Sequence, residues 1–196
     1  NQDRHSTDFL NERENFFHKP LVNLNHYLTL NDNMRLSSVL YWSGGSGGGT
    51  GTYGSVSRKP AVEGNNWWAS SPWQWDWDAE IAENSNNIDS DYSTTENRST
   101  GILRNSINRQ NTYGLISKLN YDLSDALKLQ LGLDWRTAGI EHAREVRDLL
   151  GGDYYVDFAD DNSPEGKVVR LGDKIAYSNV TTVDWLGFFG QASYSA

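Results

Sequence analysis

The sequence lacks several features, and each absence excludes a class of protein. It has no cysteine among 196 residues, which excludes a disulfide framework and a thiolate metal site. The net charge of −9 argues against a nucleic-acid partner, because phosphate binding needs a basic surface. No apolar run approaches the roughly 20 residues of a transmembrane helix. The single methionine is Met34, and the two ends look cut, so we expect a segment of a longer protein.

Strict alternation of apolar and polar residues over positions 113–137 is the strongest pattern that the sequence does contain. Charged and amide side chains separate apolar side chains at the odd positions, which are Tyr113, Leu115, Leu119, Tyr121, Leu123, Leu127, Leu129, Leu131, Leu133 and Trp135. Successive side chains leave opposite faces of a strand, so this period predicts two β-strands that share one apolar face.

The link between these two strands is short enough to set their register. Opposed residues of an antiparallel pair share a face, so a three-residue turn over 124–126 places Leu123 opposite Leu127. The same register places Asp122 opposite Lys128 on the polar face. A two-residue turn would mix the faces, and we reject it.

A second hairpin repeats this one at an offset of 93 positions. Residues 21–30 alternate, residues 31–33 are turn formers, and alternation resumes from Met34 to Trp42, which aligns with Trp135. We predict an all-β antiparallel meander of about five strands. The strands are expected near residues 17–30, 34–43, 112–123, 127–139 and 181–196.

The links between the predicted strands alternate between short and long. Residues 44–111 and 143–180 show no sustained period and are predicted as long loops, the first with a mobile glycine-rich base. A short helix is expected over 140–150, with ion pairs along one face. Long structureless loops are unusual in compact soluble domains, whereas outer-membrane barrels combine short turns at one end with long loops at the other. The pattern therefore favours part of a transmembrane β-barrel, and a soluble meander with one buried face is the alternative.

Three stretches resemble a known family: LRNSINRQNTYGLISKLNYDL, LKLQLGLDWRTAGIEHAREVRDLLGGDYY and LGDKIAYSNVTTVDWLGFFGQASY. They resemble the barrel of TonB-dependent outer-membrane receptors over most of residues 103–196, and more weakly over 21–54. The resemblance implies a closed barrel in the outer membrane of a bacterial cell, with outer-membrane lipid around it. It also implies energised uptake of a scarce ligand through a plug that contacts the TonB complex. The sequence shows no plug domain, so we expect a partial barrel segment with extracellular loops 44–111 and 143–180.

Tryptophans of the first long loop are the candidate ligand-binding residues, namely Trp67, Trp68, Trp73, Trp75 and Trp77. If residues 73–77 are extended, three of these rings share a face and could stack on a glycan, a peptide or another ring-bearing small molecule. The alternative, which the sequence favours, is that they pack the loop onto the barrel rim. Acidic neighbours at 76, 78 and 80 favour a neutral or cationic ligand.

The remaining motifs give weaker evidence of a functional site. GTGTYG at 49–54 matches a dinucleotide fingerprint, but no helix pattern follows it. Asp153, Asp157, Asp160 and Asp161 do not match the calcium-loop spacing, so we expect no metal and no cofactor. No nucleophile elbow is present, and no carboxylate pair is singled out, so we do not expect an enzyme. We predict a receptor segment that binds and takes up a ligand; the alternatives are a soluble tryptophan-rich β-domain that binds glycans and, third, a secreted glycosidase fragment.

Overall fold

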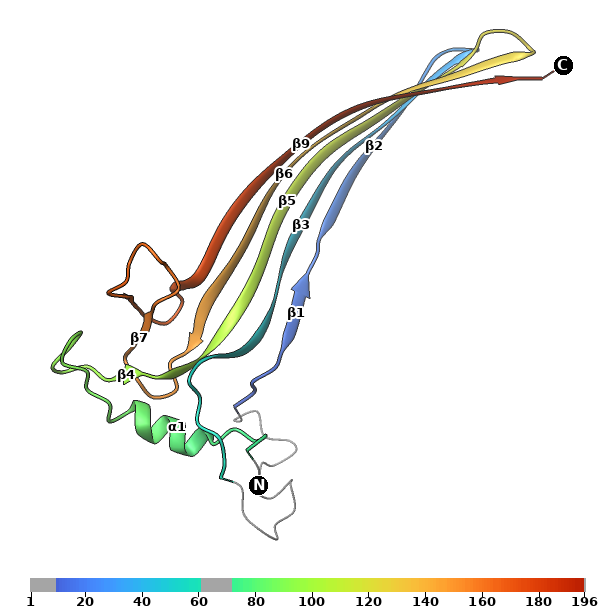
Figure 1. Cartoon of the computed structure of the whole chain (residues 1–196). Coiled ribbons are helices and arrows are strands. Elements are labelled where there is room, and N and C mark those ends of the chain that lie inside the picture. The colour runs from blue at the N-terminus through green and yellow to red at the C-terminus, as the bar shows by residue number, and fades with distance from the viewer. Residues whose placement is uncertain (1–9, 61–71, 196) are drawn as a thin grey trace. The chain divides into compact units, whose positions relative to one another are not determined.

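The computed structural model describes residues 10–60 and 72–195, and most of them lie in β-strands, which confirms the predicted all-β antiparallel meander. In chain order the elements are β1 (Asn15–His18), β2 (Leu21–Asn31), β3 (Met34–Gly54), α1 (Trp77–Asn84), β4 (Arg98–Ser99), β5 (Gly101–Asp122), β6 (Leu127–Asp148), β7 (Tyr154–Asp157), β8 (Lys167–Val169) and β9 (Lys174–Tyr194). The long strands lie side by side (Figure 1) in the order β1-β3-β5-β6-β9, and β2 also pairs with β3. No helix among these residues is long and apolar enough to cross a membrane.

Four strands are longer than the alternation predicts. Residues 44–54 and 101–111, which the sequence predicts as loop, continue β3 and β5, and β6 and β9 are extended in the same way. A backbone ladder needs no apolar side chains, so strand pairing can continue past the alternating stretch. The glycine-rich run is therefore strand rather than a mobile loop base. A Cβ at Gly48 would lie 2.6 Å from the carbonyl oxygen of Ser106, so the missing side chain lets the two backbones approach closely.

The short helix expected over residues 140–150 is wrong, because this stretch belongs mostly to β6. The expected ion pairs along a helix face are wrong with it. Glu141 pairs with Arg109 of β5 at 3.2 Å, and Arg147 pairs with Glu14 at 2.6 Å. Pairing with the flanking strands overrides the local helix propensity of the charged residues.

The chain divides into two compact units. Within the described residues, unit 1 comprises residues 10–16, 48–60, 72–107 and 142–179. Unit 2 comprises residues 17–47, 108–141 and 180–195. Unit 2 thus holds the alternating parts of the strands and the two short turns, while unit 1 holds α1, β4, β7, β8 and the remaining parts of the long strands.

In unit 2, the register predicted for the β5–β6 hairpin is confirmed at its turn. The backbone N–H of Leu123 donates to the carbonyl of Leu127 at 3.0 Å, as a three-residue turn requires. On the polar face, Lys128 Nζ lies 4.0 Å from a carboxylate oxygen of Asp122. The apolar side chains of β5 and β6 therefore lie on the same face of the strand pair.

The β2–β3 hairpin pairs as the sequence predicts, except at its turn. Leu28 faces Leu36, so the apolar positions match. Asn31, however, pairs with Met34, and the register shifts at Leu30. The predicted three-residue turn is therefore a two-residue turn over 32–33, preceded by a bulge at Leu30 that absorbs the extra residue and keeps the faces matched.

The sheet of unit 2 has one apolar and one polar face. Ser38 Oγ of β3 lies 2.8 Å from Ser117 Oγ of β5, which places even positions of β3 and odd positions of β5 on the same, apolar face. A Cβ at Gly190 of β9 would lie 3.4 Å from Leu131 of β6, which extends that face to β9. The apolar residues that alternate in the sequence thus form one continuous surface across the sheet.

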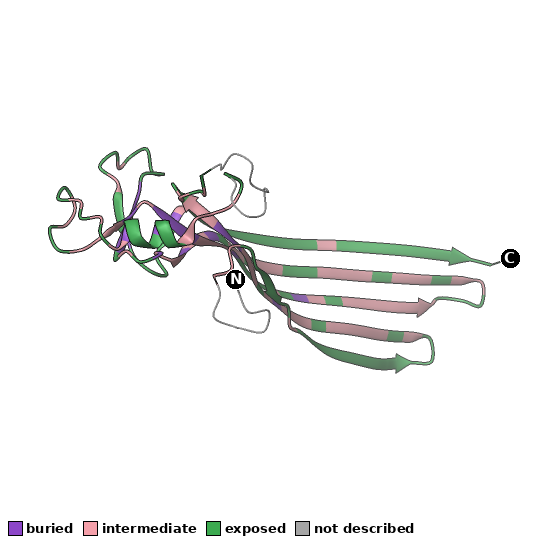
Figure 2. Ribbon diagram, turned by 90° about the horizontal axis from the view of Figure 1, so that it is seen from below, coloured by how far each residue is buried: buried purple, intermediate pink, exposed green. Residues whose placement is uncertain are grey.

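Burial differs between the units (Figure 2). In the described part of unit 2 the buried residues are two glycines, Gly44 and Gly114, so none of its described apolar side chains is buried. Leu131, in the middle of the alternating stretch of β6, is 55% exposed. An apolar surface of this extent on a soluble protein usually marks an interaction site.

Unit 1, in contrast, has a packed hydrophobic core. Ile102 of β5, Val146 of β6, Val169 of β8 and Ile175 of β9 are almost completely buried together. Each such side chain contributes about 1.5–3 kcal/mol on burial. The short strands β4, β7 and β8 form a second, three-stranded sheet in this unit. The links that the sequence predicts as long loops therefore fold into a structure of their own.

Candidate functional site

The tryptophans singled out in the sequence do not form one extended face. Trp67 and Trp68 lie outside the described residues. Trp73 lies in a turn and is 84% exposed, Trp75 forms an isolated bridge with Arg58, and α1 begins at Trp77. The condition that residues 73–77 are extended is not met, because Trp73 lies in a turn and Trp77 is in α1. Asp76 caps this helix, with its carboxylate accepting a hydrogen bond from the N–H of Ala79.

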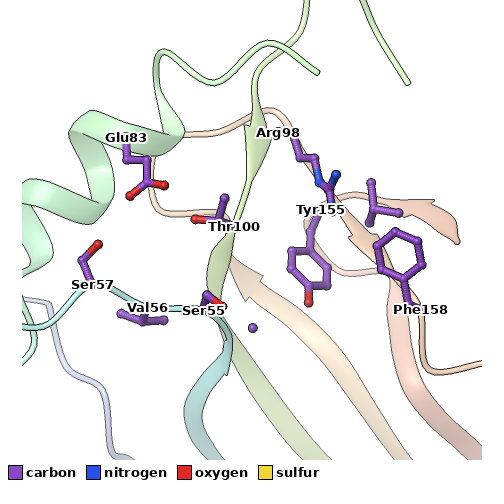
Figure 3. A pocket seen from close by; sticks show the side chains of 10 residues that line it. Ser55, Val56, Ser57, Glu83, Arg98, Thr100, Tyr155 and Phe158 are labelled. Atoms are coloured by element: carbon purple, nitrogen blue, oxygen red, sulfur yellow. The ribbon is translucent and has the colours of Figure 1, made fainter. Parts of the chain in front are cut away.

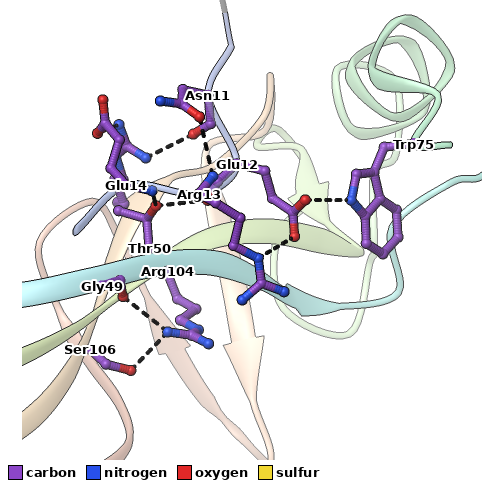
Figure 4. A network of polar contacts seen from close by, with 10 residues as sticks. Asn11, Glu12, Arg13, Glu14, Gly49, Thr50, Trp75, Arg104 and Ser106 are labelled. Atoms are coloured by element: carbon purple, nitrogen blue, oxygen red, sulfur yellow. Dashed lines mark hydrogen bonds and ion pairs between the residues drawn. The ribbon is translucent and has the colours of Figure 1, made fainter. Parts of the chain in front are cut away.

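Trp75 is held by packing within unit 1 (Figure 4). Its indole Nε1 donates to the Glu12 carboxylate at 2.8 Å, and the other oxygen of that carboxylate accepts from Arg13 Nε at 3.1 Å. The guanidinium of Arg58 lies 3.7 Å from the centroid of the Trp75 ring, a cation–π contact. These contacts show that Trp75 packs against other residues of unit 1. Ligand contact by Trp73, Trp75 and Trp77 stays a prediction.

The same region of unit 1 contains a partly buried cationic residue, Arg104. Arg104 Nη1 donates to the carbonyl of Gly49 at 3.0 Å and to Ser106 Oγ at 2.8 Å. Burial lowers the pKa of Arg104, and the positive charges of Arg144 and Arg13 lower it further. Arg13, Arg104 and Arg144 are therefore close enough for their positive charges to interact.

Two polar residues of α1, both fully buried, attach the helix to the strands around it. The side-chain amide of Asn84 donates to the carbonyls of Gly101, Leu149 and Leu150 at 3.1, 3.3 and 3.1 Å. Its oxygen accepts from the N–H of Thr100 at 2.9 Å. A buried amide with all these partners fixes a helix in one position, because shifting it would leave several groups unpaired.

Glu80, one turn earlier in α1, makes the second attachment. Its carboxylate accepts from the N–H of Ser57 at 2.7 Å and from the Thr100 hydroxyl at 3.2 Å. A Cβ at Gly101 would lie 2.7 Å from Glu80 Oε1, so glycine makes room for the carboxylate. The sequence identified Glu80 only as an acidic neighbour of the tryptophans, whereas its structural role is to hold α1 in place.

A cavity of about 460 Å³ lies beside this attachment (Figure 3). Its volume is within the range of about 300–1,000 Å³ typical of ligand clefts. Its lining is a mixture of hydroxyl, charged and aromatic side chains around glycine and valine: Gly54, Ser55, Val56, Ser57, Glu83, Arg98, Thr100, Tyr155, Val156 and Phe158. Every one of these residues belongs to unit 1.

Arg98 is the positively charged residue among those that line this cavity, and its charge is paired with a carboxylate. Its guanidinium lies 2.5 Å from the Asp89 carboxylate, and it also lies 5.3 and 5.6 Å from the ring centroids of Tyr92 and Phe158. The hydrogen bond from Arg98 holds the pKa of Asp89 below its usual range. Glu83, on α1, is the carboxylate among the lining residues.

Tyr155 provides the fixed aromatic wall. Its ring packs edge-on against Tyr53, with centroids 5.8 Å apart and an interplanar angle of 62°. Burial raises the pKa of Tyr155 to about 12, and the neighbouring Tyr53 phenol and Asp157 carboxylate add to the rise. The phenol therefore stays protonated at physiological pH and can donate a hydrogen bond.

Three of the four aspartates considered as calcium ligands, Asp153, Asp157 and Asp160, accept hydrogen bonds within the protein. Asp157 accepts from the Tyr53 hydroxyl at 3.3 Å and from the N–H of Ala176 at 2.7 Å. Asp153 accepts from the N–H of Asn97 at 2.8 Å. Asp160 accepts from the N–H of Asn162 at 2.9 Å, which closes a turn. Among the described residues, no group of three or more acidic or histidine side chains is placed to hold a metal ion.

The cavity brings together residues that the sequence did not indicate as a site. Glu83, Arg98, Tyr155 and Phe158 come from distant parts of the chain, and no spacing relates them. The aromatic run at 154–158 was the one visible signal. Comparisons with protein-family models, with curated proteins and with solved structures found no match for this chain.

Proposed function

We propose that unit 2 forms part of the wall of a bacterial outer-membrane β-barrel, in a receptor of the TonB-dependent type. In this proposal the apolar face contacts lipid, and unit 1 captures the ligand. The observation that carries the proposal is the apolar face itself: it runs across the sheet of unit 2, and none of its described side chains is buried.

The dimensions of the apolar face support this function. The alternating stretch of β6 from Leu127 to Trp135 has nine residues, and a tilted strand needs about 9–11 to span a bilayer. Aromatic residues such as Trp42 and Trp135 lie at the end of the apolar stretch away from the short turns, where membrane barrels carry an aromatic girdle. The ion pair between Arg109 and Glu141 lies farther along the same face. In the proposed barrel this position is beyond the hydrocarbon layer, where charged side chains are expected.

The long links support the capture role. Functional loops are usually presented by a rigid scaffold, and in unit 1 they are folded around a cavity of about 460 Å³. Energised uptake would further require a plug domain and the TonB complex as partners.

The soluble glycan-binding domain is the competing function. It requires the apolar face of unit 2 to be buried in the protein core, and the described residues place no second layer against that face. This observation favours the membrane function.

Insertion into lipid tests the proposal. The full chain should float with phosphatidylethanolamine–phosphatidylglycerol vesicles and stay with them after an alkaline wash. Leu131→Arg places a charge in the middle of the apolar face and should destabilise the inserted form by about 2–4 kcal/mol. Gln130→Arg, on the opposite face of the same strand, is the matched control and should insert normally. Equal insertion of the two variants, or a wild-type chain left in the aqueous fraction, would contradict the proposal.

A further inference from the structure

We propose that the cavity of unit 1 binds an amino sugar, with the ammonium group toward Glu83 and the sugar ring against Tyr155 and Phe158. This inference rests on the proposed function in one respect, namely that unit 1 is the part that captures a ligand. The chemistry of the ligand is argued from the cavity alone.

The aromatic end of the cavity suits the apolar face of a sugar ring. Tyr155 is fixed by its edge-on contact with Tyr53, so its ring loses little freedom on binding. Phe158 is 51% exposed and lies on the same side of the cavity (Figure 3). Gly54 leaves this wall open, since a Cβ there would lie 3.1 Å from the Tyr155 ring. A flat ring can therefore approach the aromatic side chains closely.

The opposite end of the cavity suits a cation. Glu83 lies in the last turn of α1, a turn that has no basic residue. The C-terminal end of a helix carries partial negative charge, which adds to the charge of the carboxylate. Arg98 does not offset this charge, because its guanidinium is already paired with Asp89 at 2.5 Å. The cavity thus has an excess of negative charge at the Glu83 end, which favours an ammonium group over an anionic one.

Hydroxyl groups also line the cavity. Ser55, Ser57 and Thr100 contribute three hydroxyls, and Figure 3 shows Ser55 and Thr100 between Glu83 and the aromatic rings. A hydroxyl can donate and accept, and the Thr100 hydroxyl, which donates to Glu80 within the protein, can still accept. These groups match the hydroxyls of a sugar better than the surface of a hydrocarbon. A ring, an ammonium group and several hydroxyls are together the features of an amino sugar.

The test compares two ligands that differ at the amino position, where acetylation replaces the charged ammonium group by a neutral amide. Binding of a glucosamine tetramer and of its N-acetylated form to the full chain in detergent micelles is measured by titration calorimetry. We expect the glucosamine tetramer to bind at least about tenfold more tightly, because acetylation removes the charge that faces Glu83. Equal binding of the two ligands, or no binding of either, would overturn the inference.

Variants then assign the effect to the cavity. Glu83→Gln should remove the preference for the charged tetramer, and Phe158→Leu, which keeps an apolar side chain without a ring, should weaken both ligands. Glu165→Gln changes the net charge equally outside the lining and should leave both affinities unchanged. An identical loss from Glu83→Gln and Glu165→Gln would show a general charge effect and contradict the site.

This assay separates the two proposals. Binding is measured in detergent, so a chain that binds glucosamine but fails to float with vesicles contradicts only the membrane function. A chain that floats but shows no preference for the charged tetramer contradicts only the amino-sugar site.

Discussion

The carboxylate of Asp122 on β5 lies 2.9 Å from the guanidinium of Arg35 on β3. Lys128 of β6 approaches the same carboxylate at 4.0 Å. Arg35 and Lys128 occupy equivalent positions in the two hairpins, each just after a short turn and 93 positions apart in the sequence. The N–H of Asp122 also donates to the carbonyl of Asn33 at 2.9 Å, so the repeated turns lie beside each other. Exposed pairs of this kind contribute at most about 1 kcal/mol, so their main consequence is to mark the register.

Cross-linking tests this register directly. The chain has no cysteine of its own, so an intramolecular disulfide can form only between the two introduced cysteines. The three-residue turn places Asn120 opposite Gln130, at a separation of about 4.5–5.5 Å between Cα atoms, which a disulfide can bridge. Cysteines at 120 and 130 should form a disulfide in high yield under mild oxidation. A pair at 120 and 131, on opposite faces, is the control, and preferential cross-linking of that pair would refute the register.

A glycine on the polar face is covered by an aromatic ring. A Cβ at Gly132 of β6 would lie 1.9 Å from the Phe189 ring of β9, whereas a Cβ at Gly139 of the same strand meets nothing within 4 Å. Gly132→Ala should displace the ring and lower the free energy of unfolding by up to about 1 kcal/mol, the scale of a cross-strand pair. Gly139→Ala should be neutral or stabilising, because alanine restricts the unfolded chain. Denaturant unfolding in micelles measures both, and the reverse order would show that the ring does not cover Gly132.

Removing the Asn84 side chain should loosen unit 1. Asn84→Ala removes the side-chain donor to the buried carbonyls of Gly101 and Leu150, and an unsatisfied buried group costs about 1–3 kcal/mol. The carbonyl of Leu149 also loses this donor but still accepts from the Ser99 hydroxyl. Asn86→Ala removes an exposed amide bonded to one carbonyl of the same helix, and should cost less than about 0.5 kcal/mol. Hydrogen exchange of the amides of α1 and β4 reports the difference. Equal protection in the two variants would mean that Asn84 does not hold the helix.

Alkaline pH should destabilise unit 1 through Tyr155. Its pKa is raised to about 12 in the folded chain, above the ordinary value of 10.0, so the folded state favours the protonated phenol. The corresponding stability is fully present below pH 10 and is lost as the pH rises from about 10 to about 12. The difference in tyrosinate absorbance between wild type and Tyr155→Phe isolates this group. If the Tyr155 phenol titrated near pH 10 in the folded chain, as it does in the denatured control, its burial would be contradicted.

Alternation in the sequence predicts the part of the fold in which side chains face two different environments. In β5 and β6 it places Leu123 against Leu127 and Asp122 beside Lys128, both as found. Alternation cannot predict a strand whose two faces do not differ in polarity. The glycine-rich part of β3, which extends to Gly54, is such a strand, so the sequence pattern does not indicate it. Alternation also cannot weigh tertiary pairing against local propensity, so the charged end of β6 was expected to be helical.

The candidate site was less predictable because its residues meet through the folding of two long links. The tryptophans stood out by composition, yet Trp75 serves to pack unit 1 through Glu12 and Arg58. Glu83 and Tyr155 lie far apart in the sequence, and only the fold of unit 1 brings them to one cavity. Spatial neighbours of this kind leave no spacing for a sequence pattern to detect.

The central claim is that one face of unit 2 contacts lipid, and spin-label accessibility along β6 measures this most directly. Single cysteines at Leu129, Leu131 and Leu133 and at Lys128, Gln130 and Asp134 carry nitroxide labels in the full chain, reconstituted in phosphatidylethanolamine–phosphatidylglycerol vesicles. The account predicts a period of two, since strand side chains alternate between faces. Labels at the three leucines should collide with oxygen, which is concentrated in the bilayer, and labels at the three polar positions should collide with a water-soluble nickel complex. Equal accessibility at all six positions, or the opposite phase, would contradict it.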